Sequence, residues 1–187
     1  MHDIARRSFI KGASIGTLAF TVSGIEVMLT PKEARAQGVP LRILNSAEAE
    51  TLESVGDMLA SGAKDAGIAH FVDQQLTVPP PYALLSLRVS EFRPPYVDFY
   101  RDALAALESS AKAVHSRKFS EFSEAEKLEF VDLLSHHEIE AWDSTVTQTL
   151  VYATLRNDAV DVVYGTVDGF ARIGVPYLPH ILPERKW

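Results

Sequence analysis

The chain has 187 residues, a formal net charge of −7, 47% hydrophobic residues and 23% charged residues. This balance is typical of a globular protein, and the length is sufficient for one domain with a substantial core. The negative charge argues against nucleic-acid binding, because an acidic surface repels phosphate backbones. The chain contains no cysteine, which excludes disulfides, haem attached through Cys-x-x-Cys-His, cysteine-ligated iron–sulfur clusters and a cysteine nucleophile.

The beginning of the chain has the features of an export signal. Its basic part contains Arg6 and Arg7, which are followed by Phe9 and Lys11. An uncharged segment then occupies residues 12–25. This segment is too short to span a bilayer comfortably, since a membrane helix needs about 20 apolar residues. An arginine pair in this setting indicates the twin-arginine route, which exports proteins that have already folded.

A small-x-small site follows the uncharged segment at Ala34-Arg35-Ala36. Sites of this kind are cut by signal peptidase, so the sequence predicts cleavage after Ala36. We therefore expect a twin-arginine signal peptide at residues 1–36 and a mature periplasmic domain at residues 37–187. If the signal is not cut, it remains as an N-terminal tether.

Two helices are predicted in the first part of this domain. Asn45 is a good N-cap, and Glu48 stands where its side chain can reach back to it. Apolar residues at helical spacing continue to about residue 61. A second, shorter helix is predicted for residues 68–76, before the three prolines at residues 79–81 exclude further helix.

The central part of the chain predicts two more helices. Residues 82–94 fit either a short helix or an apolar loop. The proline pair that follows suits a helix start, and apolar residues at helical spacing run from Tyr96 to Val114. Residues 123–126 form a capping box, and the helical pattern after it extends to Trp142.

The last predicted helix spans about residues 144–155 and is closed by Asn157-Asp158. From Tyr164 onward the chain is rich in glycine, proline and aromatic residues, which makes a long helix improbable beyond Gly174. Strand signals are weak throughout. The sequence thus predicts an all-α fold: a single domain of about five helices with an irregular Gly/Pro/aromatic C-terminal tail, which must cover its own helices or a partner.

Three groups of residues invite a chemical interpretation. His136 and Glu140 could share a metal ion, but neighbouring His137 points about 100° away on a helix and the zincin pattern His-Glu-x-x-His is absent. A polar, solvated turn is the preferred interpretation. The tail glycines do not have the spacing of a nucleotide-binding loop. Asp158, Asp161 and Asp168 lack calcium-loop spacing and are interpreted as surface acids.

Several features together resemble the gluconate 2-dehydrogenase subunit 3 family. They are the helix near residues 52–59, the Phe71-Val72-Asp73 segment, the stretch from Phe119 to Glu126, and the tail with Tyr164-Gly165, Asp168-Gly169-Phe170 and Ile173-Gly174-Val175-Pro176. The resemblance implies a small, non-catalytic subunit of a membrane-associated sugar or sugar-acid dehydrogenase. In this family the large subunit carries FAD and the chemistry, a cytochrome c subunit often accepts the electrons, and the small subunit holds no cofactor.

The resemblance also implies how the small subunit acts. It is expected to bind the flavoprotein, to help it mature and to take it through the twin-arginine translocase. The expected partner interface consists of residues in the tail: Tyr164, Gly165, Gly169, Phe170, Gly174, Pro176, Tyr177 and Leu178. No catalytic, cofactor-binding or metal-binding residue is expected in this chain.

Two alternatives to the subunit role stay open at this stage. One is an enzyme or binding protein in which His136, His137, Glu140 or Asp168 lines a ligand pocket. The other is a stand-alone periplasmic structural protein with an unrelated partner. The protein that co-purifies with the chain distinguishes these from the subunit role.

Overall fold

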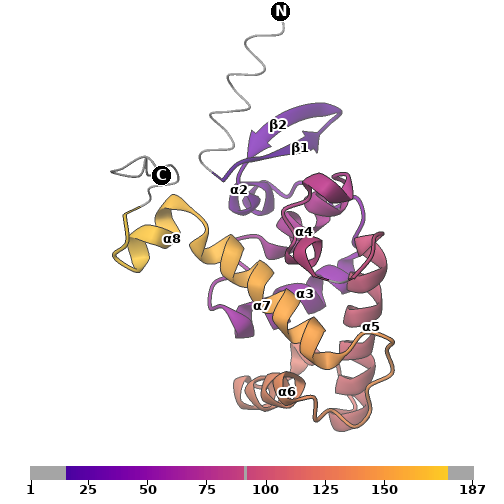
Figure 1. Ribbon diagram of the computed structural model, residues 1–187. Helices are drawn as coiled ribbons and strands as arrows, with labels where there is room; N and C mark the ends of the chain where they lie inside the picture. The colour runs from indigo at the N-terminus through magenta and orange to yellow at the C-terminus, as the bar shows by residue number, and fades with distance from the viewer. Residues whose placement is uncertain (1–15, 91, 177–187) are drawn as a thin grey trace, which may run out of the picture.

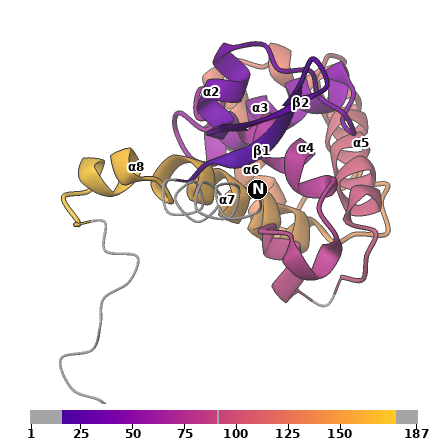
Figure 2. The same ribbon diagram turned by 90° about the horizontal axis from the view of Figure 1, so that it is seen from above.

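The computed structural model describes residues 16–90 and 92–176 (Figures 1 and 2). Within them, a β-hairpin of β1 (Leu18–Val22) and β2 (Ile25–Leu29) precedes a series of helices. The α-helices are α2 (Pro31–Ala36), α3 (Ser46–Leu59), α4 (Ile68–Leu76), α5 (Tyr96–His115), α6 (Glu124–His136), α7 (Gln148–Tyr164) and α8 (Val167–Arg172), and the 3-10 helices are η1 (Pro80–Tyr82), η2 (Ser86–Val89) and η3 (Phe119–Glu121). The all-α prediction is confirmed, because the hairpin is the only sheet among the described residues.

Helix α7 runs across one face of the helical body and packs against α3, α4 and α6, while α5 packs against α3 (Figure 1). Large side chains with almost no exposure fill the space between these helices, among them Leu52, Phe99, Tyr100, Phe130 and Leu155. Apolar side chains from helices distant in sequence thus form one core, and burial of their surface is the main stabilising contribution to such a fold.

Local capping sets the starts of α3 and α6. The Asn45 side chain accepts hydrogen bonds from the backbone of Ala47 and Glu48, and the Glu48 carboxylate accepts one from Asn45 N at 2.8 Å. Ser123 and Glu126 form the same reciprocal arrangement at α6. Both capping boxes were predicted, and both are confirmed. They could be predicted because each depends on residues only three positions apart.

The two middle helices differ from the predicted pattern at their ends. Helix α6 stops at His136 instead of continuing to Trp142, because His137 adopts the left-handed conformation with a φ of 64°. On this helix Leu128 is 62% exposed, whereas Phe130 and Val131 are buried. The segment at residues 82–94 was left open between helix and loop. In its described part Tyr82 ends η1 and Ser86–Val89 form η2, and there is no α-helix.

A hairpin and a short helix occupy residues 18–36, where the sequence predicted a removable signal. The register pairs Leu18 with Leu29 and Val22 with Ile25, and the turn between the strands places Ser23 and Gly24 at positive φ. This β-structure was not predicted, since the uncharged run was interpreted only as an export segment. The two strands contact α4 and α2, so this segment packs on the helical body.

Candidate functional site

Helix α7 continues for two turns beyond the point where the sequence predicted its end. The predicted stop was Asn157-Asp158, because short polar side chains compete for backbone hydrogen bonds. In the structure the Asp158 side chain is fully buried and bonds to other elements, so the helix continues to Tyr164. The interpretation of Asp158 as a surface acid is therefore wrong, and the extra turns carry the chain toward the tail.

Asp158 joins three elements inside the body. Its Oδ2 accepts a hydrogen bond of 2.5 Å from the hydroxyl of Tyr100 on α5, and its Oδ1 accepts one of 3.2 Å from Ser86 Oγ at the start of η2. Burial raises the pKa of the Asp158 carboxyl to about 6, against the lowering effect of these hydrogen bonds. Burial and the neighbouring Asp158 charge also raise the pKa of Tyr100. Because both groups are enclosed, this cluster can position η2 on α7 but cannot meet a substrate.

The glycines of the tail shape a tight connection from α7 into α8. Gly165 caps α7 and donates its N–H to Asp161 O at 2.9 Å. Gly169 is buried where α8 folds back, and a Cβ there would lie 2.3 Å from Val163 O. Only glycine fits so close to a backbone oxygen. The tail is therefore helical where irregular chain was predicted, and its glycines provide close approach.

The end of α8 is a glycine-containing cap. Gly174 has a φ of +69°, and the N–H of Val175 donates to Phe170 O at 3.1 Å, which is the hydrogen-bond pattern of a Schellman motif. Pro176 follows and is exposed. Residues 175–176 are irregular, as predicted for the tail, while Tyr177 and Leu178 lie outside the described residues.

Exposed apolar side chains gather on the end of α7 and on α8. We call Val160, Val167, Ile173 and Val175 the α7–α8 surface; Ile173 is 55% exposed. Of the residues predicted for the partner interface, Tyr164 and Phe170 are half-buried, and Gly165, Gly174 and Pro176 are exposed. Figures 1 and 2 both show α8 extending away from the helical body at the end of α7. Apolar side chains on a projecting element are characteristic of surfaces that another protein covers.

A second exposed apolar group lies between α4 and α5, where sequence reasoning found no clear element. Tyr82, Leu84 and Val89 form what we call the 82–89 loop, and each is more than half exposed. Ser86 in the same loop is held by Asp158 on α7. The loop is thus anchored from inside while its apolar side chains point outward. The sequence signal for this exposed loop is the run of apolar residues that directly follows the three prolines.

The residues considered for a metal or a ligand do not come together. His136 is exposed at the end of α6, and its Nδ1 lies 2.9 Å from Asp132 O, a contact that raises the pKa of His136. His137 and Glu140 follow in the connection to α7, and Asp168 is exposed on α8. Among the described residues, no group of three or more His, Asp or Glu is placed to hold a metal ion.

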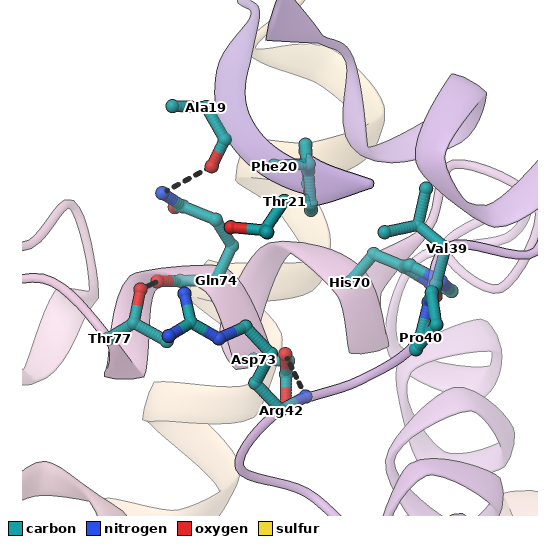
Figure 3. Close-up of a pocket in the computed structure, with 10 residues that line it drawn as sticks. All are labelled: Ala19, Phe20, Thr21, Val39, Pro40, Arg42, His70, Asp73, Gln74 and Thr77. Carbon is teal, nitrogen blue, oxygen red and sulfur yellow. Dashed lines mark hydrogen bonds between the residues drawn. The ribbon is translucent and has the colours of Figure 1, made fainter. Parts of the chain in front are cut away.

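The described part of the chain is hollowed at two places that could be considered for a ligand. A depression of about 240 Å³ lies between α3 and α5, and charged side chains at its rim pair with each other, as Arg101 does with Glu48 and Lys118 with Glu50. A smaller cavity of about 20 Å³ lies between the hairpin and α4 (Figure 3). Neither hollow joins a nucleophile to a base in the arrangement that covalent catalysis needs.

The predicted export signal lies only partly within the described residues. Arg6, Arg7, Phe9 and Lys11 lie outside them. Ala34 and Ala36, the two small residues of the predicted cleavage site, belong to α2. No helix in the described ranges has both the length and the apolar character required to cross a membrane.

Comparison with known proteins gives one match. The family model described as gluconate 2-dehydrogenase subunit 3 matches residues 46–177, which extends from the start of α3 past the end of α8. The match covers more than two thirds of the chain and leaves the hairpin and α2 outside. No curated protein and no solved structure matches the chain.

Proposed function

Because this chain belongs to the gluconate 2-dehydrogenase subunit 3 family, we propose that it is the non-catalytic small subunit of a periplasmic, FAD-dependent dehydrogenase of sugars or sugar acids. The observation that carries this proposal is the family match over residues 46–177, since the family is named for a subunit of an oxidoreductase complex. In the proposed complex the large subunit binds FAD and oxidises the substrate. A cytochrome c subunit is a further candidate partner, as acceptor of the electrons.

The distribution of apolar side chains supports a binding role. The α7–α8 surface and the 82–89 loop expose valine, leucine, isoleucine and tyrosine side chains instead of an assembled set of acids, bases and nucleophiles. Apolar and aromatic side chains of this kind contribute most when they enter pockets at the centre of an interface. We assign the α7–α8 surface to the flavoprotein, because α8 projects from the body and leaves its sides accessible (Figure 2).

The leader supports a role in export. Arg6 and Arg7 belong to a signal for the twin-arginine translocase, which takes folded proteins. A flavoprotein must fold around FAD before it leaves the cytoplasm, because the cofactor is held by the folded chain. In the proposed sequence the small subunit binds the maturing flavoprotein, and both are exported as one passenger.

The export role is tested by the double variant Arg6→Lys, Arg7→Lys in the native host. We expect both chains to remain in the cytoplasm, measured as flavin-dependent dehydrogenase activity in periplasmic and cytoplasmic fractions. The exposed Arg93→Lys is the control for a conservative change elsewhere and leaves export intact. Flavoprotein that still reaches the periplasm in the double variant contradicts the export role.

The binding role is tested by placing a charge on the α7–α8 surface. Ile173→Asp is expected to reduce recovery of the flavoprotein about tenfold or more, because a buried unpaired carboxylate disfavours an apolar interface. Leu128→Asp is the matched control, since Leu128 on α6 is also more than half exposed and lies outside the proposed interface. Both variants should melt at nearly the same temperature. Full recovery with Ile173→Asp shows that the flavoprotein binds elsewhere.

A further inference from the structure

Residues 18–39 form a folded unit at the N-terminus, which we call the N-terminal unit. It comprises the hairpin, α2 and the residues that end at Val39. A small apolar cluster of its own holds it together: Phe20, Leu29, Ala34 and Val39, each less than a tenth exposed. The segment that the sequence predicts to be a removable leader therefore has an apolar core of its own. A signal peptide that is cut off does not need such a core.

Helix α4 and the turn before it hold this unit against the body. Gln74 Nε2 donates to Ala19 O at 3.2 Å, and His70 Nε2 lies 3.0 Å from Val39 O. Figure 3 shows these side chains reaching from α4 to the first strand and to the chain after α2. At Gly67 the backbone comes so close to Pro31 that a Cβ would lie 2.3 Å from Pro31 O. The unit is thus attached along α4 by polar contacts and by close backbone approach.

The predicted cleavage site is part of the attached face. Ala34 has 0% exposure and belongs to the small apolar cluster. Arg35, between the two alanines, pairs with Glu53 on α3 at 3.4 Å and with Asp65 at 3.4 Å. The Ala34 carbonyl accepts a hydrogen bond of 2.9 Å from Val39 N. One of the two small side chains that define the site is therefore enclosed, and the residue between them is bound to the body.

The peptide bond to be cut is also in helical geometry. Gln37 contributes the nitrogen of this bond, and its N–H donates to Glu33 O at 2.9 Å. A reciprocal capping box between Thr30 and Glu33 fixes the start of the same helix. Proteases bind their substrates as extended strands and cut preferentially in exposed, mobile chain. Cleavage after Ala36 thus requires α2 to unwind and Ala34 to leave its cluster.

We propose that docking of the N-terminal unit on α4 protects the Ala34-Arg35-Ala36 site, so that the folded chain keeps residues 18–39 and is not cut after Ala36 by signal peptidase. The inference rests on the proposed function only in taking this site to be the one that signal peptidase would meet on export. It replaces the expectation that the mature chain begins after Ala36. The family match begins at residue 46, so the N-terminal unit is an addition to the part that this chain shares with the family.

The test compares purified full-length chain with a synthetic peptide of residues 28–42, both incubated with signal peptidase in detergent and followed by mass spectrometry. The peptide should be cut after Ala36. The folded chain should be cut at least about tenfold more slowly, because cleavage then depends on the small population in which the unit is open. Equal rates for peptide and folded chain overturn the proposal. A resistant peptide does so too, since there is then no site to protect.

Two matched pairs of variants separate protection by docking from resistance of any other origin. Phe20→Asp puts a charge into the small cluster, whereas Ile25→Asp puts one at a position that is 67% exposed on the same hairpin. Gly67→Ala places a Cβ against Pro31, whereas Gly62→Ala, also at positive φ, meets only the end of a flexible arginine side chain at 3.9 Å. The first member of each pair should be cut faster than wild type and the second should not.

Circular dichroism on the same samples verifies that the helical body remains folded in each variant. If Phe20→Asp and Gly67→Ala both stay as resistant as wild type, docking does not protect the site and the proposal is wrong. The N-terminus of chain recovered from the periplasm gives the complementary result. Chain found there that begins at Gln37 contradicts the protection proposal alone. Chain that never reaches the periplasm contradicts the export proposal, and the purified-protein assay still decides the protection proposal.

Discussion

The buried carboxyl of Asp158 predicts an unusual dependence of stability on pH. Burial raises its pKa in the folded protein to about 6, from an ordinary value of 3.8. The folded state therefore binds a proton more tightly than the unfolded state. A raised carboxyl pKa contributes stability below pH 4 that is lost as the pH rises from about 4 to about 6. The difference of about two pKa units corresponds to about 3 kcal/mol in the free energy of unfolding.

The variant Asp158→Asn isolates this contribution, because an amide does not ionise in this range. The assay is urea unfolding at several pH values between 4 and 7, with the difference in unfolding free energy taken between variant and wild type. Surface carboxyls with a lowered pKa, such as Glu33 and Glu126, make the protein less stable as the pH falls. They titrate alike in the variant and in wild type, so their effect cancels in the difference between the two unfolding free energies.

We expect Asp158→Asn to gain about 2 kcal/mol relative to wild type as the pH rises from 4 to 7, since part of the contribution is already lost at pH 4. The variant Tyr100→Phe removes the hydrogen bond that lowers the pKa of Asp158, so it should move the wild-type loss of stability to higher pH. A difference between Asp158→Asn and wild type that stays constant across this range refutes the reasoning. Asp158 would then titrate alike in the folded and unfolded states.

Three further substitutions test other parts of the structure. Gly169→Ala forces a Cβ against Val163 O and should detach α8, which we expect to measure as loss of flavoprotein in pull-downs with little change in the melting of the body. Asp73→Asn weakens the buried carboxylate that accepts the N–H groups of residues 42–44 at 2.8 to 3.1 Å, and urea unfolding should show a loss of about 1–3 kcal/mol. Ser123→Ala removes an N-cap and should cost about 1 kcal/mol in the same assay. No change in unfolding free energy for either of the last two contradicts the structural role assigned to that side chain.

The features that the sequence predicted well depend on short-range rules. The capping boxes at Asn45 and Ser123 and the long apolar stripe of α5 require only residues three or four positions apart, so the starts of α3 and α6 and the existence of α5 were predictable. The family resemblance was also predictable from the sequence, and the match over residues 46–177 confirms it.

The features that the sequence did not predict depend on distant partners. Asp158 was interpreted as the end of a helix because local rules favour that position for a short polar side chain. Its partner, the Tyr100 hydroxyl, is 58 positions away in the sequence, so no local rule reveals it. The hairpin of Leu18–Val22 and Ile25–Leu29 was not predicted because an uncharged run after two arginines has the composition of a leader, while its core forms with α2 and the residues beyond it. The helical part of the tail was missed because glycine at position 169 serves close packing, although glycine disfavours helix on local grounds.

The central claim is that this chain is the small subunit of a flavoprotein dehydrogenase. Its most direct test is a pull-down of C-terminally tagged chain from the periplasm of the native host, with an absorbance spectrum of the eluate. The account predicts a larger protein in stoichiometric amount and the spectrum of bound flavin. A colourless chain without a partner contradicts the account, and a partner without flavin favours a periplasmic binding or structural role instead.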